Sequence, residues 1–337
     1  MSANTVNITP PSPVLLLDRR SVSDLITLDQ CVPTMEAAFA AHARGASLEP
    51  GLLHVSAKEG EFHIKAGGLT GSRTYFCTKI NGGFFGNPRS YGLPSIIGVL
   101  VLCDGETGKP LSIMESGLIT RLRTGAATAV AAKYLARESS RTVTVCGAGS
   151  QAEYQVRALR TVLPIDQVFI WSRNGGSTLA STLRKMLAID VTEVSDLAAA
   201  VGNSDIVITC TPSRHPFLMR EYVRKGTFVA AIGSDSPEKQ ELEPELLAAS
   251  SVVPDLLNQA LRVGDLHHAV EQGVMRADQI RGELGAVVAG IAPRRLSDHE
   301  IIIFDSTGTA LQDTAVAAAV YERAVAQGIG QEFPFWG

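Results

Sequence analysis

The stretch TVTVCGAGSQAEYQVRALR, from Thr142 to Arg160, decides the fold. It begins with a short run of residues that favour a buried strand and continues directly into Gly147-Ala148-Gly149. From about Ser150 the apolar residues recur at helical spacing. A strand, a tight glycine turn and a helix in this order are typical of the first βαβ unit of a doubly wound sheet.

The glycine turn predicts a dinucleotide site. Gly147 permits the tight turn, and Gly149 lets a pyrophosphate approach the backbone N–H groups at the positive end of the helix. The GxGxxA spacing ends on Ala152, whose small side chain lets the helix pack close to the strand. This spacing also occurs in other strand-turn-helix units, but here a further strand, QVFIW, follows the helix. We therefore expect dinucleotide binding at this turn.

The end of that next strand bears on the choice of cofactor. Proteins that select NAD usually place an acidic residue there, next to the ribose hydroxyls, whereas this chain has Ser172 and Arg173. A hydroxyl and a guanidinium suit a ribose 2′-phosphate, so NADP(H) is favoured and NAD(H) is possible. A solvated surface arginine is the alternative interpretation of Arg173.

The remaining sequence predicts two domains. From Arg141 onward apolar strands alternate with helices, which indicates an α/β Rossmann fold, a doubly wound parallel sheet covered on both faces. Residues 51–104 contain short runs broken by turn residues, typical of antiparallel sheet. A long helix over about 116–138 would bridge the domains, and a last helix over about 309–327 would fold back onto the first domain. The predicted division is an α+β domain over residues 1–128 and 310–337, a Rossmann domain over 129–309, and a loose proline-rich arm at 1–13.

Composition narrows the class of protein. The net charge of −4 and the absence of blocks of like charge argue against a nucleic-acid or membrane-surface partner and favour a small molecule. The five cysteines form no CxxC pair and the N-terminus has no basic-then-apolar leader, so we expect a cytoplasmic protein with reduced thiols. The histidines show no HxxH or HExxH spacing, and His267-His268 resembles a solvated helix face, so no metal site is expected.

Asp235 is the first candidate for chemistry. In GTFVAAIGSDSPEKQELE, residues 226–243, it lies just past an apolar strand, at the edge where doubly wound sheets bind their ligands. The alternative is that Ser234 or Asp235 caps a helix that runs into PEKQELEPELL. Both interpretations remain open from these residues alone.

Buried cations are the second group of candidates. Lys79 lies between apolar neighbours in a strand, Lys65 is similar, and Arg123 lies near the start of the bridging helix with Arg121. A cation in an apolar segment needs a partner, and a substrate carboxylate is one possibility. Internal ion pairs with Glu115 or Asp104 are the alternative.

The combination of motifs resembles the ornithine cyclodeaminase/mu-crystallin family. The match rests on Lys79 followed by GLPS, then SGLITRLRTGAATAVAAKYLAR, VTVCGAGSQAEYQVRAL, WSR, IGSDSPEKQEL and FDSTGTALQD, in one consistent order from about residue 14 to the C-terminus. The resemblance implies a homodimer whose first domain binds substrate and forms the interface, with a Rossmann domain for a nicotinamide cofactor.

The resemblance also implies roles for individual residues. Lys79 and Arg123 resemble the positions that hold the substrate carboxylate, and Asp235 resembles the catalytic carboxylate, with Lys79 as a second catalytic candidate. Asp235 would orient or protonate the substrate nitrogen, and a pKa near neutrality is expected if it is the acid. The positions that resemble dinucleotide contacts, or residues near the nicotinamide, are Thr124, Gly147, Gly149, Ser150, Gln151, Ser172, Arg173, Thr211, Ser306 and Gly308.

One departure from the family bears on the substrate. Cyclodeaminases usually carry an arginine two residues after the proline that corresponds to Pro50, and this chain has Leu52 there. Lys65 is a possible replacement, and ornithine cyclisation becomes doubtful. The resemblance thus favours an NAD(P)H-dependent reductase of an α-imino acid or cyclic ketimine, such as 1-pyrroline-2-carboxylate. The alternatives are an NAD-dependent ornithine cyclodeaminase and a non-catalytic protein that binds NADPH and a small ligand.

Overall fold

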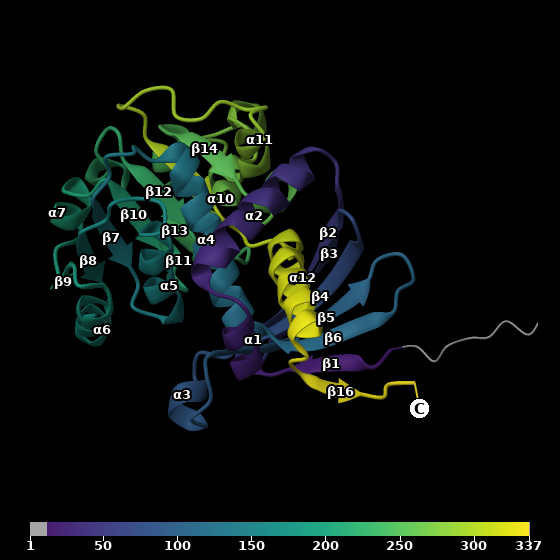
Figure 1. The fold of residues 1–337 in the computed structure, drawn as a ribbon. Helices are drawn as coiled ribbons and strands as arrows, with labels where there is room; N and C mark the ends of the chain where they lie inside the picture. Colours follow the sequence, from purple (N-terminus) through teal and green to yellow (C-terminus); the bar gives the residue numbers. More distant parts are fainter. Residues whose placement is uncertain (1–11, 337) are drawn as a thin grey trace, which may run out of the picture.

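A computed structural model describes residues 12–336 of the chain (Figure 1). The elements form two large sheets with helices between and around them. The first eleven residues of the predicted arm at 1–13 lie outside the described part. Within that part, no helix has the length and apolar character needed to cross a membrane.

The first sheet is mainly antiparallel, as the turn-rich segment predicted. Its order is β16-β1-β6-β5-β4-β3-β2, and only β1 and β6 pair in parallel. The C-terminal strand β16, which the sequence did not predict, joins the edge beside β1. The strands are β1 (Val14–Leu17), β2 (Ser47–Ala57), β3 (Gly60–Thr70), β4 (Thr74–Gly83), β5 (Ile96–Asp104), β6 (Pro110–Glu115) and β16 (Gln331–Phe333).

One face of this sheet is covered by helices. The last helix, α12 (Ala310–Gln327), contacts β3 and β4 and also packs against α2 (Leu28–Ala43) and α4 (Ser116–Leu135) (Figure 1). The predicted last helix is therefore confirmed in position against the first sheet. The opposite face of the sheet carries several exposed apolar side chains. Two shorter helices are α1 (Arg19–Leu25) and α3 (Asn87–Ser90).

The second sheet is parallel and confirms the Rossmann-type fold class. Its order is β14-β15-β12-β10-β7-β8-β9, with β7 flanked by β10 and β8. The edge strand β9 was not predicted, because its polar, alternating sequence lacks the apolar run of the other strands. The strands are β7 (Thr142–Cys146), β8 (Gln167–Trp171), β9 (Asp190–Val194), β10 (Ile206–Thr209), β12 (Phe228–Ala231), β14 (Ser251–Pro254) and β15 (Ile302–Asp305).

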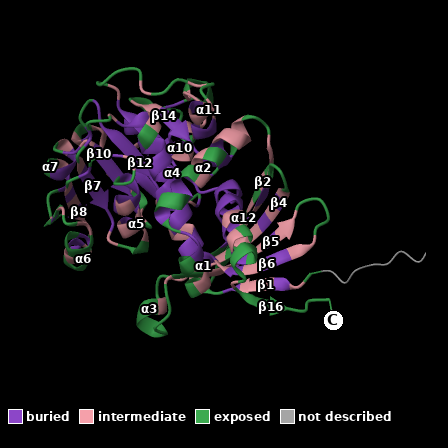
Figure 2. Ribbon diagram, in the orientation of Figure 1, coloured by how far each residue is buried: buried purple, intermediate pink, exposed green. Residues whose placement is uncertain are grey.

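Both faces of the parallel sheet are buried (Figure 2). Ile206 and Ile208 belong to the large core that also contains α4, whereas the intervening Val207 belongs to a separate core on the other face. This explains why such strands read as continuous apolar runs. The helices of this part are α5 (Ser150–Leu159), α6 (Ser177–Leu187), α7 (Leu197–Gly202), α8 (Pro244–Ala248), α9 (Leu257–Ala260), α10 (Asp265–Glu271) and α11 (Leu284–Val288), with 3₁₀ turns at Arg220–Tyr222 and Ala277–Gln279.

The long helix α4 lies between the two sheets, as predicted, and its buried face is rich in alanine. It ends at Leu135 instead of near Glu138, because Ala136 adopts an extended backbone. A small sheet that the sequence did not predict pairs β11 (Arg214–Leu218) with β13 (Gln240–Leu242). The exact domain division at residues 128/129 and 309/310 stays a prediction, as does the cytoplasmic location.

Candidate functional site

Two of the predicted cations share one buried carboxylate. Lys79 Nζ lies 2.6 Å from Asp313 Oδ2, and Arg123 Nε lies 3.1 Å from Asp313 Oδ1. Arg123 Nη1 also donates to Gln312 Oε1 at 2.8 Å. Lys79 comes from β4, Arg123 from α4 and Asp313 from α12, so the place where these elements meet brings the charges together.

The alternative that these cations form internal ion pairs holds for Lys79 and Arg123, but its suggested partners, Glu115 and Asp104, are wrong. Glu115 accepts from the backbone N–H of Gly117 at 2.8 Å, so it caps the N-terminus of α4. Asp104 lies at the far end of β5 and pairs with Arg73 at 2.7 Å. A helix N-terminus and an exposed arginine satisfy these two carboxylates. The buried counter-charge for Lys79 and Arg123 is instead Asp313, a residue that the sequence analysis did not single out.

Lys65 lies beside this group but has a different environment. It is the direct cross-strand partner of Lys79, and its ammonium donates to the backbone carbonyls of Thr307, at 2.9 Å, and Gly308, at 2.6 Å. Burial lowers the pKa of both lysines, to about 7 for Lys79, where the attraction of Asp313 opposes burial. The group therefore contains three basic side chains, and one of them, Lys79, can change its protonation state near neutral pH.

Lys65 also faces Leu52 across β2 and β3. Leu52, Lys65 and Lys79 thus occupy one rung of the sheet, on the same face. A side chain at position 52 and the side chain of Lys65 are neighbours on this rung. The arrangement is compatible with the prediction that Lys65 replaces the missing arginine, which stays a prediction.

Asp235 follows β12 and does not cap a helix. Residues 236–239 form a turn that leads into β13, so the capping interpretation is wrong. The carboxylate of Asp235 instead pairs with Lys239 Nζ at 2.7 Å, and its side chain is 39% exposed. Burial acts to raise its pKa, but the charges of Lys239, His63 and Lys65 hold the pKa of Asp235 well below its ordinary value. The expectation of a pKa near neutrality is therefore wrong, and Asp235 is a carboxylate at physiological pH.

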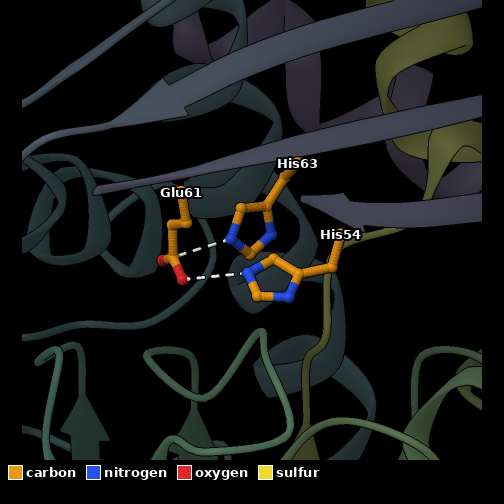
Figure 3. Close-up of side chains that lie close together, drawn as sticks. All are labelled: His54, Glu61 and His63. Carbon is orange, nitrogen blue, oxygen red and sulfur yellow. Dashed lines mark hydrogen bonds and ion pairs between the residues drawn. The ribbon is translucent and has the colours of Figure 1, made fainter. Parts of the chain in front are cut away.

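Lys239 connects Asp235 to a cluster on the first sheet. Its ammonium also lies 3.0 Å from Glu61 Oε1. Glu61 accepts in turn from two histidines: His54 Nε2 lies 3.1 Å from Oε2, and His63 Nε2 lies 3.2 Å from Oε1 (Figure 3). We call these three residues the His54–Glu61–His63 cluster. The sequence signal that was missed is the alternation of Glu61, His63 and Lys65 on one face of a strand.

The glycine turn after β7 has the geometry that a pyrophosphate needs. Gly147 has φ of +119°, and a Cβ there would lie 2.8 Å from the carbonyl oxygen of Cys210. A Cβ on Gly149 would meet no atom within 4 Å, so the space beside the backbone is open. The helix α5 begins at Ser150 without a side-chain cap, which leaves its first N–H groups free for an anion. These observations fit a dinucleotide.

The other predicted cofactor positions gather at the same edge of the sheet. Cys146, Thr209, Ala231 and Asp305 are in register across β7, β10, β12 and β15, so the residues that follow each strand emerge together. These include Thr211 and Ser306. Gln151 is near Thr120 on α4, with 3.4 Å between its Nε2 and the Thr120 carbonyl, and Thr124 is buried one turn further along. Ser172 and the exposed Arg173 follow β8.

Glu241 holds two of these strand ends in place and was missed by the sequence analysis. Its carboxylate accepts from the backbone N–H of Thr211 at 2.6 Å and from that of Gly233 at 2.8 Å. Burial raises its pKa, and the hydrogen bonds oppose this shift. Since Gly233 precedes Asp235 by two residues, Glu241 fixes the loop that carries the catalytic candidate.

Gly308 links the edge of the parallel sheet, where the predicted cofactor positions lie, to the side chains of Lys65 and Arg123. Its φ is +71°, and a Cβ there would lie 2.6 Å from Arg123 Nη1. Its N–H donates to Asp255 Oδ2 at 2.7 Å, and its carbonyl accepts from Lys65. Asp255, which the sequence analysis also missed, therefore fixes a turn that touches two predicted substrate ligands.

Comparison with known proteins identifies the family of the chain. The sequence profile of the ornithine cyclodeaminase/mu-crystallin family matches residues 14–328. The chain belongs to this family. Among curated family relatives, the alanine dehydrogenase of Archaeoglobus fulgidus is 37% identical over 331 residues, which cover 96% of this chain and 98% of the relative. The iminosuccinate reductase of Paracoccus denitrificans is 35% identical, with 95% and 99% coverage.

Solved structures of family members have the same fold. The Δ1-pyrroline-2-carboxylate reductase of Thermococcus litoralis, in complex with NADH and L-proline, superimposes with a TM-score of 0.91 at 30% identity over 95% of this chain and 100% of that chain. An archaeal alanine dehydrogenase dimer with bound NAD gives a TM-score of 0.90 at 36% identity over 96% and 99%. The Rossmann fold and the family predicted from the sequence are thus confirmed.

Proposed function

We propose that this protein is an NAD(P)H-dependent reductase of an α-imino acid or a cyclic ketimine. The observation that carries the proposal is the pair Lys79 and Arg123 on the single carboxylate of Asp313. With both cations charged, the group has one positive charge more than Asp313 neutralises. A substrate carboxylate would supply the missing negative charge and take up donors that the planar guanidinium still offers.

The second support is the position and charge of Asp235. It lies past β12 at the edge of the sheet where the predicted cofactor positions gather. Its lowered pKa keeps it ionised, so it would orient and stabilise a protonated imine nitrogen instead of donating the proton itself. Lys79, with a pKa of about 7, can exchange a proton near neutrality, which supports its role as a second catalytic residue.

The cofactor supplies hydride to the imine carbon when it is bound. The residues of this chain would hold it at the turn of Gly147, Gly149 and Ser150, whose open space and free N–H groups fit a pyrophosphate. Relatives with NAD, NADH or NAD⁺ in their structures support a nicotinamide dinucleotide. The exposed Arg173 supports NADP(H) as the preferred form, with Ser172 as its partner for the 2′-phosphate.

We also propose a homodimer formed through the first sheet. The face opposite α12 presents exposed apolar side chains, and Leu53, Ile64, Ile80 and Val99 form one aligned row across β2 to β5. A row of this kind on a sheet surface is typical of a protein interface. The archaeal alanine dehydrogenase, which has the same fold, is described as a dimer.

The test is a substrate panel with purified protein. NADPH and NADH oxidation would be followed with 1-pyrroline-2-carboxylate, 1-piperideine-2-carboxylate, iminosuccinate, and pyruvate with ammonia, alongside ammonia release from ornithine with NAD⁺. Rapid oxidation with an imine and no ornithine turnover would support the proposal. Ammonia release without net NADH would establish a cyclodeaminase, and tight NADPH binding without turnover of any substrate would establish a binding protein.

A further inference from the structure

The His54–Glu61–His63 cluster has the composition of a transition-metal site. His54 and His63 are direct cross-strand partners on β2 and β3, and Glu61 lies two residues from His63 on the same face. The two imidazole Nε2 atoms and the carboxylate converge, and the three ligand atoms all lie within 4.8 Å of one another (Figure 3). Two imidazoles and one carboxylate are ligands that suit Zn²⁺ and related divalent ions.

The spacing of the donors agrees with this composition. The Nε2 atoms of His54 and His63 lie 3.1 and 3.2 Å from the Glu61 oxygens. Ligand bonds of about 2.0–2.2 Å that meet at tetrahedral or octahedral angles place neighbouring donor atoms about 3.0–3.5 Å apart. An ion could therefore take the place of the protons between the imidazoles and the carboxylate.

The backbone also favours a preformed site. All three residues lie on paired strands, and their side chains are only 10–22% exposed. Ligands on strands of a sheet are held more rigidly than ligands on loops. The cluster is still open enough for an ion to enter from the side of His54, the most exposed of the three.

One group opposes a cation at this position. The ammonium of Lys239 lies 3.0 Å from Glu61 Oε1 and forms ion pairs with both Glu61 and Asp235. A divalent ion on Glu61 would repel this ammonium and weaken its hold on Glu61. Binding at the cluster and the position of Lys239 are therefore coupled, and through Lys239 the coupling reaches Asp235.

We propose that His54, Glu61 and His63 form a binding site for one Zn²⁺-type divalent ion, and that occupancy of this site displaces Lys239 from Glu61. The first half of this statement depends only on the cluster. The second half, an effect of the ion on turnover through Asp235, rests on the proposed imine reductase function.

The test begins with binding of Zn²⁺ alone to the metal-free chain, measured by titration calorimetry without cofactor or substrate. One ion per chain is expected, and E61Q and H54A should each weaken binding at least tenfold, because H54A removes one of three ligands and E61Q replaces the anionic ligand by a neutral amide. The matched control is E271Q, which removes the carboxylate of a more exposed group formed by His267, His268 and Glu271. Its affinity for the ion should equal that of the wild type.

Cobalt and a lysine variant give two further readouts. Co²⁺ should develop d–d absorption bands in the wild type and in E271Q but not in H54A. K239M removes the competing ammonium and should bind Zn²⁺ about tenfold more tightly, a change that an ion bound elsewhere would not show. Retention of stoichiometric binding in both E61Q and H54A, or its loss in E271Q, would overturn the site.

The effect on turnover is measured separately. Zn²⁺ should slow imine reduction by the wild type, and the inhibition constant should match the dissociation constant from calorimetry. In H54A the same ion concentration should have at least tenfold less effect, relative to the rate of that variant without metal. If imines are reduced but no ion binds, the metal site is wrong and the function stands. If the ion binds and no imine is reduced, the function is wrong and the site stands.

Discussion

Lys65 and Lys79 face each other across β3 and β4, but only Lys79 reaches a carboxylate. Lys79 pairs with Asp313, whereas the ammonium of Lys65 is held by the backbone carbonyls of Thr307 and Gly308. The two lysines therefore have distinct tasks in the proposed site. In the proposal, Lys79 is part of the charged group that would meet the substrate, and Lys65 ties the first sheet to the turn that carries Gly308.

The pKa of Lys79 predicts how ligand affinity depends on pH. Because this pKa is lowered to about 7, the ammonium is present below pH 7 and is lost above it. Affinity for a carboxylate should therefore fall above pH 7, by up to about tenfold per pH unit. Pyrrole-2-carboxylate keeps a constant charge between pH 6 and 9, so its dissociation constant, measured by calorimetry over this range, reports the lysine. K79R stays charged and should lose the inflection near pH 7, and an unchanged inflection in K79R would contradict the assignment.

Replacing Asp235 by asparagine should slow turnover by about 100-fold or more, because the neutral amide cannot stabilise a protonated imine. The dissociation constant of NADPH, measured by fluorescence, should change less than about twofold. E238Q, an exposed neighbour, is the matched control and should keep the rate of the wild type. Equal rates for D235N and the wild type would remove Asp235 from the mechanism.

The lowered pKa of Asp235 makes a second prediction. A carboxylate that stays ionised to well below its ordinary pKa contributes no titration between pH 5 and 9. The pH profile of kcat in D235N should therefore have the same shape as that of the wild type, at a lower level. The loss of an inflection in D235N would show that Asp235 carries the transferred proton.

Arg173 should decide between the two forms of the cofactor. In R173A the KM for NADPH should rise about tenfold or more, while the KM for NADH stays within about twofold, because only NADPH carries the 2′-phosphate. K185A changes another exposed cation, on α6, and should alter neither value. Steady-state rates with both cofactors provide the measurement. Equal changes in the KM values for NADPH and NADH in R173A would show that Arg173 is a solvated surface residue without a role in cofactor selection.

A charge in the apolar row of the first sheet should separate the proposed dimer. Ile80 is 39% exposed at the centre of this row, so I80D would place a carboxylate in the interface and should yield monomers in sedimentation velocity. M186D places the same charge on α6, where Met186 is 49% exposed, and should leave the dimer intact. Dimers of I80D would show that the interface lies elsewhere.

Local patterns in the sequence were sufficient to predict the fold and to place most of the candidate cofactor positions at one edge of the parallel sheet. The strand, glycine turn and helix from Thr142 onward are contiguous, so their spacing carries the geometry directly. The predicted positions after other strands gather because parallel strands end at one edge. Short polar strands such as β9, β11 and β13 could not be predicted, since their pairing and not their apolar pattern defines them.

The ion-pair partners of the charged residues could not be predicted from the sequence, for a physical reason. Lys79 signalled a buried cation, but its counter-charge, Asp313, is 234 residues away in the chain. In the same way Glu61 and Lys239 are 178 residues apart, and each looks like an ordinary surface charge in its own segment. The sign of the pKa shift at Asp235 depends on these contacts, and this is why the shift toward neutrality, expected if Asp235 is the acid, is not found.

The location of Asp313 on α12 also matters for the order in which the protein is made. Synthesis proceeds from the N-terminus, so Lys79 and Arg123 leave the ribosome long before the helix that carries their shared carboxylate. Until that helix has been synthesised, burying these two cations costs free energy, and the face of the sheet around them has to stay hydrated. α12 closes this face, so the group around Lys79 and Arg123 can form only after this helix has been synthesised.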